Sequence, residues 1–381
     1  MVGDHAYARV HDVKAHSFRD AELLGRGAVN LDSDVGKGPL NVLNRQRFLQ
    51  PTHGRLALRV EEPTTPYTRC ANERPGGARK GYGAHLCYPM FEVEDAIGQH
   101  LELVKAPTRV VSLVPSETVS VFDLVGRERL IGRTDYCVEP AGAIEAVPTV
   151  GGTKRFDVQA VVDLKPDLVL ANKEENSRAL VMALIEAGLK VHVSFPCTVA
   201  DSNRYLANLC QLLDVNPDES PHLRRCREAA ARAEASSTTK LIPVFVPIWR
   251  DPWMTFDGRA YASDVLRLAG AHNVFAGRPR RYPLAADLGK GVAWTEEKVD
   301  QRDTRYPRVR LEEVVERGAR AVLLPDEPYA FSEKDFAAFR ELESSSKLDL
   351  ELIDGKDVFW YGTRVIVAID RLRACIDRLG Q

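Results

Sequence analysis

The sequence has few cysteines for its length, and none of them forms a recognisable pair. The seven cysteines among 381 residues are odd in number, widely scattered and without a CxxC spacing. This pattern argues against a disulfide framework or a cysteine-based zinc site and is typical of buried, reduced thiols. They are Cys70, Cys87, Cys137, Cys197, Cys210, Cys226 and Cys375.

An excess of either charge and a long hydrophobic run are also missing. The formal net charge is −2 and 44% of the residues are hydrophobic, so the composition is that of a globular protein. Such a balance predicts no binding to nucleic acid or to an anionic membrane. No run of about 18 apolar residues could span a bilayer. The first twenty residues contain no apolar segment of about 7–15 residues, so we expect no signal peptide there.

Familiar catalytic and metal-binding motifs are absent as well. The chain contains no GxSxG, no Walker loop and no strand-associated GxGxxG. None of its nine histidines is spaced as a ligand pair inside the predicted fold, and His192, between Val191 and Val193, is expected to be structural. We therefore expect a protein that is not an enzyme, without an intrinsic cofactor or a side-chain metal site.

What the chain does contain is an alternation of helices and strands, shown most clearly over residues 148–176. A glycine turn at Gly151 and Gly152 precedes a short amphipathic helix, which Pro166 ends because proline cannot continue the helical ladder. The apolar run 167–171 follows and reads as a parallel strand that is covered on both faces. The polar residues 172–176 then stand at its carboxyl end, where ligands of open α/β sheets bind.

Similar units are expected before and after this stretch, which predicts the α/β class. A β-hairpin is expected at 91–104, and a helix begins at Pro115, where Glu117 suits the positive helix N-terminus. Further strands are expected at 109–114, 129–136, 191–195, 241–248 and 321–324. Further helices are expected at 180–185, 205–213, 217–235, 261–269, 311–316 and 365–376. Residues 278–305 form a polar insertion with little periodicity, and loops of that length are usually functional or disordered.

The loops that end the predicted strands carry aromatic residues beside charged groups. Such loops suit a planar macrocycle or an aryl chelate, which needs stacking faces and a few directed donors. Packing in the core or between lobes is the alternative for the aromatic residues. The candidate ligand-binding residues are Tyr136, Trp253, Tyr306, Trp360, Tyr361 and Arg364.

The stretch 148–176, with its "LKPDLV" strand, and the order of the later motifs resemble a known family. The chain is similar, over about residues 91–379, to the substrate-binding proteins of ABC importers for cobalamin and iron–siderophores. This resemblance implies two Rossmann-like lobes, joined by a long rigid helix, with the ligand cleft between them. It also implies a metal chelate as ligand, a cobalamin-like corrinoid or a ferric siderophore, and places Tyr136, Tyr306 and Arg364 near it. Thr153 and Asn172 stand where the cobalamin binder has tryptophans, which reduces the stacking surface for cobalamin itself.

The resemblance further implies docking to the permease subunits of an ABC transporter. In the family, one surface glutamate on each lobe pairs with arginines of the membrane subunits. Glu312 matches the position on the second lobe, whereas Gln159 occupies the position on the first lobe, so one carboxylate is missing. We expect a monomer that docks mainly through Glu312.

The expected organisation has four parts. Residues 1–89 are an extension of unknown role with weak periodicity, expected to be poorly ordered. Residues 90–215 form the N-terminal lobe with its leading hairpin, 216–237 the connecting helix, and 238–381 the C-terminal lobe with the insertion 278–305.

Two other functions stay open on the same fold. The family implies a periplasmic or cell-surface location, but the missing signal peptide favours a cytoplasmic binding or sensing protein for a corrinoid or metal chelate. A chelatase-like enzyme is the second alternative, although the histidine and acidic pair that such enzymes use is not recognised here.

Overall fold

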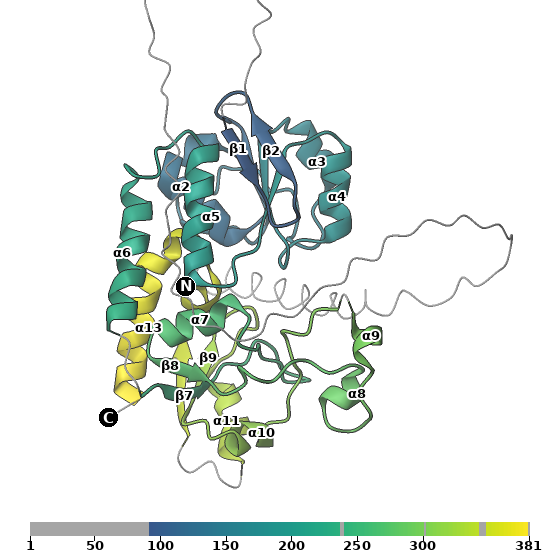
Figure 1. Ribbon diagram of the computed structural model, residues 1–381, viewed down its shortest axis with the longest axis vertical. Coiled ribbons are helices and arrows are strands. Elements are labelled where there is room, and N and C mark those ends of the chain that lie inside the picture. The colour runs from purple at the N-terminus through teal and green to yellow at the C-terminus, as the bar shows by residue number, and fades with distance from the viewer. Residues whose placement is uncertain (1–90, 237–239, 301, 343–347, 380–381) are drawn as a thin grey trace, which may run out of the picture. The chain divides into compact units, whose positions relative to one another are not determined.

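The computed structural model describes residues 91–236, 240–300, 302–342 and 348–379, which form two α/β lobes (Figure 1). Each lobe contains a four-stranded parallel sheet, so the predicted class, α/β with two Rossmann-like lobes, is confirmed. The extension expected over residues 1–89 lies outside the described residues. Among the described helices, none combines the length and the apolar character that crossing a bilayer requires.

The sheet of the first lobe has the strand order β4-β3-β5-β6 and is covered by helices on both faces. In β5, Leu168 and Leu170 pack with α2 and α5 on one face, whereas Val169 and Ala171 pack with α3 and α4 on the other. Burial on both faces explains the continuous apolar run in this part of the sequence. The elements are β3 (Val110–Ser112), α2 (Pro115–Val125), β4 (Leu130–Arg133), α3 (Val158–Asp163), β5 (Leu168–Asn172), α4 (Arg178–Glu186), β6 (Val191–Ser194) and α5 (Val199–Leu212).

The predicted hairpin is confirmed as the antiparallel pair β1 (Phe91–Glu94) and β2 (His100–Leu103). Its turn binds the outer strand β6. The backbone N–H of Ala96 donates to the carbonyl of Val193 at 2.8 Å, and the N–H of Val193 donates to Oδ2 of Asp95 at 3.1 Å. The hairpin thereby covers a sheet edge that would otherwise expose unpaired backbone groups.

Helix α6 (Pro221–Ala235) follows the first sheet and precedes the second, and it lies beside the C-terminal helix α13 (Val365–Leu379) in Figure 1. Ser220 caps its N-terminus, because its hydroxyl accepts the N–H of Leu223 at 3.3 Å. The buried face of α6 repeats at helical spacing, as the sequence pattern predicts. Its members are Leu223, Cys226, Ala229 and Ala233.

The sheet of the second lobe has the strand order β10-β9-β7-β8. Strand β7 (Ile242–Phe245) is shorter than the expected 241–248, and it ends before Pro247, which has no N–H to donate to a neighbour. The other elements are α7 (Tyr261–Leu268), β8 (Ala271–Asn273), α10 (Glu312–Glu316), β9 (Ala321–Pro325), α11 (Phe336–Arg340), β10 (Asp349–Ile353) and α12 (Gly355–Phe359). The described residues of both lobes also include the 3-10 helices η1 (Arg127–Arg129), η2 (Glu333–Asp335) and η3 (Gly362–Arg364). The strands β8 and β10 and the helices α11 and α12 were not predicted from the sequence.

The polar stretch 278–305 is built more regularly than its sequence suggests. It contains two short helices, α8 (Leu284–Asp287) and α9 (Glu296–Val299), visible in Figure 1. The guanidinium of Arg278 pairs with the fully buried carboxylate of Asp287 at 2.7 Å. The same carboxylate accepts the backbone N–H groups of Arg281 at 2.9 Å and Arg308 at 2.7 Å. The buried ion pair therefore fixes the segment internally, and the N–H of Arg308 and the contact of Arg278 with Glu313 at 3.5 Å hold it to the lobe.

Candidate functional site

A cavity of about 480 Å³ lies between the two lobes, within the range of small-molecule sites of roughly 300–1,000 Å³. From the first lobe it is lined by the start of α2, by Tyr136, by the turn at Thr153 and Lys154, and by the loop after β5. The second lobe contributes Ile248, Met254 and Phe256, the start of α7, and the loops at Tyr306 and Trp360. Both walls thus include the segments that follow strands, as is typical of ligand sites in open α/β sheets.

Four of the six predicted ligand-binding residues line this cavity. They are Tyr136, Tyr306, Trp360 and Tyr361. Tyr136 lies below the turn at Gly152, where an added Cβ would stand 3.1 Å from the ring, so the glycine permits this close packing. Trp360 follows α12, and its indole N–H donates to the carboxylate of Glu327 at 2.5 Å. These aromatic residues provide the apolar faces that the sequence analysis expects, and their contact with a ligand stays a prediction.

The structure places the other two predicted residues outside the lining. Trp253 stacks on Phe331, with ring centroids 5.8 Å apart and planes at 4°, and it meets Phe339 edge to face at 5.1 Å. Arg364 is held by Asp354 at 2.6 Å and by Asp357 at 2.7 Å. Both side chains therefore have partners within the second lobe, and we do not place either of them at the ligand.

The position of Trp253 follows from a local alternation that the sequence alone did not reveal. Residues 249–254 fold back through a bridge between Trp249 and Met254, and Met254 also pairs with Arg308. After this turn the chain pairs with residues 305–309, because the carbonyl of Trp253 accepts the N–H of Val309 and the N–H of Thr255 donates to the carbonyl of Pro307. In such an extended pairing neighbouring side chains point to opposite sides. Met254 and Phe256 consequently face the cavity, whereas Trp253 faces the core. The predicted loop therefore lines the cavity through Met254 and Phe256, while Trp253 packs against the core.

Charged groups of both signs line the cavity, and none of them is among the predicted site residues. The basic ones are Lys154, Lys173, Arg280 and Arg308, and the acidic ones are Glu174, Glu175, Asp303 and Glu327. The ammonium of Lys154 donates to the backbone carbonyl of Glu174, and burial lowers the pKa of this lysine. The glycine turn before Lys154 therefore positions a cation beside the loop after β5.

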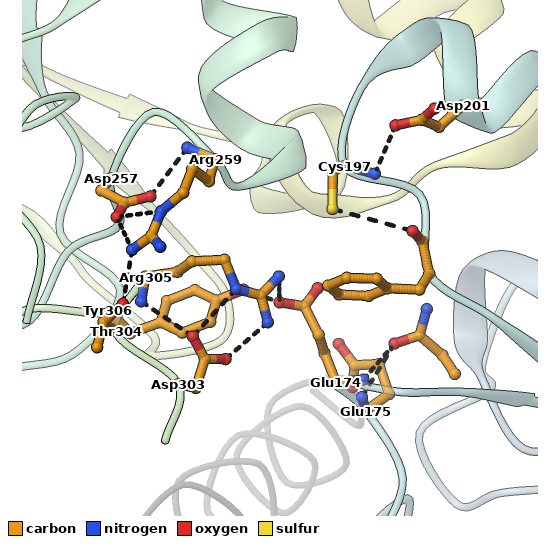
Figure 2. A network of polar contacts seen from close by, with 12 residues as sticks. Glu174, Glu175, Cys197, Asp201, Asp257, Arg259, Asp303, Thr304, Arg305 and Tyr306 are labelled. Carbon is orange, nitrogen blue, oxygen red and sulfur yellow. Dashed lines mark hydrogen bonds and ion pairs between the residues drawn. The ribbon is translucent and has the colours of Figure 1, made fainter. Parts of the chain in front are cut away.

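An ionic bridge joins the two lobes at the edge of the cavity (Figure 2). Nη1 of Arg305 lies 2.7 Å from Oε1 of Glu174, and the hydroxyl of Tyr306 donates to the same oxygen. Asp303 holds the other side of the Arg305 guanidinium at 2.6 Å. Burial raises the pKa of Glu174, and the charge of Arg305 opposes that effect. We call Glu174, Asp303, Arg305 and Tyr306 the interlobe bridge.

A second polar group lies between the lobes and centres on Glu117, whose side chain is fully buried. Its Oε1 accepts the hydroxyls of Ser194 at 2.5 Å and Tyr361 at 2.7 Å, and Asn172 donates to both of those hydroxyl groups. Burial raises the pKa of Glu117 to about 8, against the opposing effect of the Ser194 and Tyr361 hydroxyls. Glu117 lies in the first turn of α2, as the sequence predicts, and its carboxyl also belongs to a contact between the lobes, which the sequence did not reveal.

The two predicted docking residues are both exposed, one on each lobe. Glu312 is the first residue of α10, and its carboxylate is 62% exposed, 3.9 Å from Arg310. Gln159 lies in the first turn of α3 and donates through its side-chain amide to Asp163 at 2.7 Å. Asp157 caps the same helix by accepting the N–H groups of Gln159 and Ala160. Asp163 is therefore the carboxylate that stands next to Gln159, while Asp157 is engaged with the backbone.

The described residues contain no cluster of three or more histidine, cysteine, aspartate or glutamate side chains with the geometry of a metal site. The cysteines among them, five in number, are all free. Burial raises the pKa of the Cys137 and Cys197 thiols, which disfavours the reactive thiolate.

Comparison with known proteins supports the assignment of class. Residues 110–292 match the periplasmic binding protein family. A vitamin B12-binding protein from Photorhabdus laumondii is 27% identical over 189 residues, which is 48% of this chain and 66% of that protein. A vitamin B12-binding protein from Vibrio parahaemolyticus is 27% identical over 205 residues, 53% of this chain and 69% of that protein. The matches span about two thirds of each relative.

Solved structures share the fold. The periplasmic haem-binding protein RhuT from Roseiflexus has a TM-score of 0.58 at 15% identity, covering 72% of this chain and 99% of that chain. The vitamin B12-binding protein BtuF of Vibrio cholerae has a TM-score of 0.53 at 18% identity, covering 72% of this chain and 98% of that chain. The described part of the chain thus has the two-lobed fold of these periplasmic binding proteins. The resemblance to the cobalamin and iron–siderophore binding proteins is confirmed.

Proposed function

We propose that this protein captures a metal chelate, a corrinoid, haem-like ring or iron–siderophore, and delivers it to an ABC importer. The observation that carries the proposal is the cavity between the lobes, which presents Tyr136, Trp360 and Tyr361 from loops on both sides. Buried aromatic faces provide much of the contact area for a flat ligand, and the charged groups around them supply orientation. The matches to vitamin B12-binding proteins support this class of ligand.

The dimensions of the cavity favour a compact ligand, or one that projects out of it. A volume of about 480 Å³ lies in the lower half of the usual range of roughly 300–1,000 Å³. Thr153 and Asn172 offer no stacking face, and Asn172 is committed to hydrogen bonds with Ser194 and Tyr361. Complete cobalamin, with its nucleotide loop, therefore fits this arrangement less well than a haem-like ring, a smaller corrinoid or a siderophore.

Delivery to a transporter is supported by one exposed polar position on each lobe. Glu312 carries a full charge, while Gln159 offers an amide next to the carboxylate of Asp163. Such exposed ion pairs contribute only about 0–1 kcal/mol each, so docking is expected to be weak and sensitive to salt. A transporter partner places the protein in the periplasm or on the cell surface, which cell fractionation with N-terminal sequencing tests directly.

Calorimetric titration with cyanocobalamin, cobinamide, ferric protoporphyrin and two ferric siderophores tests the ligand class. We expect at least one of them to bind with a Kd below about 10 μM, equivalent to about 7 kcal/mol of binding free energy. Binding of none of these chelates, by protein that melts cooperatively, would overturn the proposed function. Conversion of a free metal and a tetrapyrrole into product would instead identify a chelatase.

A further inference from the structure

The interlobe bridge has the composition of a binding site for a carboxylate. Oε1 of Glu174 forms an ion pair with Nη1 of Arg305 at 2.7 Å and accepts a hydrogen bond from the hydroxyl of Tyr306. The guanidinium also lies over the ring of Phe195, 4.6 Å from its centroid. A planar guanidinium with a second donor and an aromatic platform suits a carboxylate well. In this structure, the carboxylate in that position is the protein's own.

The donors of this site are held without help from Glu174. Asp303 binds Arg305 through Nε at 3.0 Å and Nη2 at 2.6 Å, and it also accepts the backbone N–H of Arg305 at 2.9 Å. The carbonyl of Arg305 accepts the N–H of Asp257 at 2.7 Å. Asp303 thus occupies one edge of the guanidinium and leaves Nη1 for another acceptor (Figure 2). Departure of Glu174 would leave the site in place.

A ligand in the cavity reaches this position. Glu174, Asp303 and Tyr306 all belong to the cavity wall, and Arg305, which contacts Glu174 and Asp303, is not itself part of it. The Arg305 side chain is 15% exposed and that of Glu174 is 27% exposed, so the pair is largely shielded from water. Screening by solvent is weak there, and Asp303 does not contact Nη1, so Nη1 without any acceptor would be costly. A second carboxylate beside Nη1 is therefore favoured.

Charge balance decides whether a ligand joins Glu174 or replaces it. Arg305 already faces two carboxylates, those of Asp303 and Glu174. A third carboxylate would add repulsion between like charges without a new donor. Released Glu174 has another cation near, because the ammonium of Lys154 already binds its backbone carbonyl. Replacement is consequently favoured over addition.

From these contacts we propose that Glu174 is an internal stand-in for a carboxylate of the ligand, which displaces it from Arg305 and Tyr306. This inference rests on the proposed function and narrows it to chelates that carry at least one free carboxylate at their edge. A chelate whose edge bears only amides or esters cannot replace Glu174, so Glu174 would keep its contacts with Arg305 and Tyr306. Discrimination by a charged hydrogen-bonded site of this kind is expected to be strong.

The test compares ferric protoporphyrin, which has two propionates, with its dimethyl ester, by absorption titration of the full chain. The wild type should bind the acid at least about tenfold more tightly than the ester, a difference of about 1.4 kcal/mol. Glu174→Gln keeps the size of the side chain and removes its charge. It should raise the affinity for the acid by about tenfold and leave the affinity for the ester unchanged.

Two further variants make the comparison specific. Arg305→Lys keeps the positive charge but loses the guanidinium fork, and it should lower the affinity for the acid to that for the ester. Glu175→Gln removes the same charge from the cavity wall and leaves Glu174 on Arg305, so it should raise the affinity for the acid much less than Glu174→Gln does. Melting curves establish that each variant is folded.

Several outcomes would overturn the inference. Equal gains for acid and ester in Glu174→Gln would make Glu174 only a steric barrier, and equal gains in Glu174→Gln and Glu175→Gln would make the effect one of general charge. No gain in Glu174→Gln would also contradict the exchange. If the porphyrin acid does not bind but cyanocobalamin, cobinamide or an uncharged siderophore does, the inference is wrong and the proposed function stands. If none of the chelates binds, both the inference and the proposed function are wrong.

Discussion

The hydroxyl of Tyr361 donates to the carboxyl of Glu117 at 2.7 Å, across 244 residues of sequence. Tyr361 follows α12 in the second lobe, whereas Glu117 lies in the first turn of α2 in the first lobe. Tyr361 also belongs to the cavity wall, so one side chain contacts both the cavity and a buried titratable group. The contact therefore links the relative position of the lobes to the protonation of a single carboxyl.

Stability should depend on pH through Glu117. Its pKa is about 8 in the folded protein and near 4.5 when exposed, mainly because burial disfavours the charged form. Between these values the folded state keeps a proton that the unfolded chain releases, so the free energy of unfolding falls as pH rises from about 4.5 to about 8. Glu117→Gln removes this dependence.

The measurement is urea unfolding of the wild type and Glu117→Gln at pH 5, 6, 7, 8 and 9. Relative to the wild type, the variant should gain up to roughly 4 kcal/mol of stability between the lowest and highest pH. Oε2 of Glu117 has no hydrogen-bond partner among the described residues, so replacing the carboxyl by an amide also changes the stability by an amount that does not depend on pH. Only the change of the stability difference with pH therefore tests the prediction. A difference between the two proteins that stays constant with pH would contradict the buried protonated carboxyl.

Ligand binding should distinguish the two predicted tryptophans. Trp360→Leu removes an aromatic face from the cavity wall and should weaken binding of the preferred chelate by about 1–3 kcal/mol. Trp253→Leu is the matched control, because Trp253 packs against Phe331 and Phe339 outside the cavity. It should lower the melting temperature while affinity stays within twofold of the wild type. Equal losses of affinity in both variants would contradict the assignment of the cavity wall.

Tyr306, the aromatic residue of the interlobe bridge, should also contribute to ligand affinity. Tyr306→Ala should weaken ligand binding by about 1–3 kcal/mol, because it removes both a ring from the cavity wall and a hydroxyl. Tyr306→Phe separates these contributions, since it retains the ring and loses only the donor to Glu174. Calorimetry of both variants with one chelate shows which group matters. Affinity like that of the wild type in Tyr306→Ala would exclude this loop from the site.

Docking should depend mainly on Glu312. Glu312→Lys reverses an exposed charge and should abolish ligand-stimulated ATPase activity of a reconstituted transporter. Gln159→Glu should increase the stimulation, because it adds the charge that the first lobe lacks. The gain is limited, because the new carboxylate would stand against Asp163, and like charges four residues apart destabilise a helix by about 0.2–0.5 kcal/mol. Stimulation unaffected by Glu312→Lys would show that docking uses another surface.

The insertion should depend on its buried ion pair. Asp287→Ala leaves Arg278, which is 4% exposed, with only the more distant carboxylate of Glu313 at 3.5 Å. It also removes the acceptor of two backbone N–H groups, so it should cost about 3–5 kcal/mol of stability. Asp300→Ala changes an exposed aspartate of the same insertion and should stay within about 0.5 kcal/mol of the wild type. Urea unfolding of both variants makes the comparison. A loss below about 1 kcal/mol for Asp287→Ala would contradict an anchoring role for this pair.

Much of the fold was predictable from the sequence because it depends on local patterns. Every residue from Leu168 to Ala171 is apolar, and this pattern indicates a strand that is buried on both faces. The helical spacing of Leu223, Cys226 and Ala229 likewise marks one buried face of α6. The short strand β8 and the edge strand β10, which is exposed at two of its five positions, show no such pattern. Their pairing depends on the neighbouring strands, so they were missed.

The candidate site shows the same division between local pattern and long-range contact. By itself, the sequence determined that aromatic residues stand in loops after the strands, and it identified Tyr136, Tyr306, Trp360 and Tyr361. It did not determine which way each side chain points, because that depends on contacts with distant segments. Trp253 faces the core through its packing on Phe331, and Arg364 faces two aspartates. The tertiary structure alone brought Glu174 to Arg305 and Glu117 to Tyr361, since burying a charged or titratable group requires partners that only the folded chain assembles.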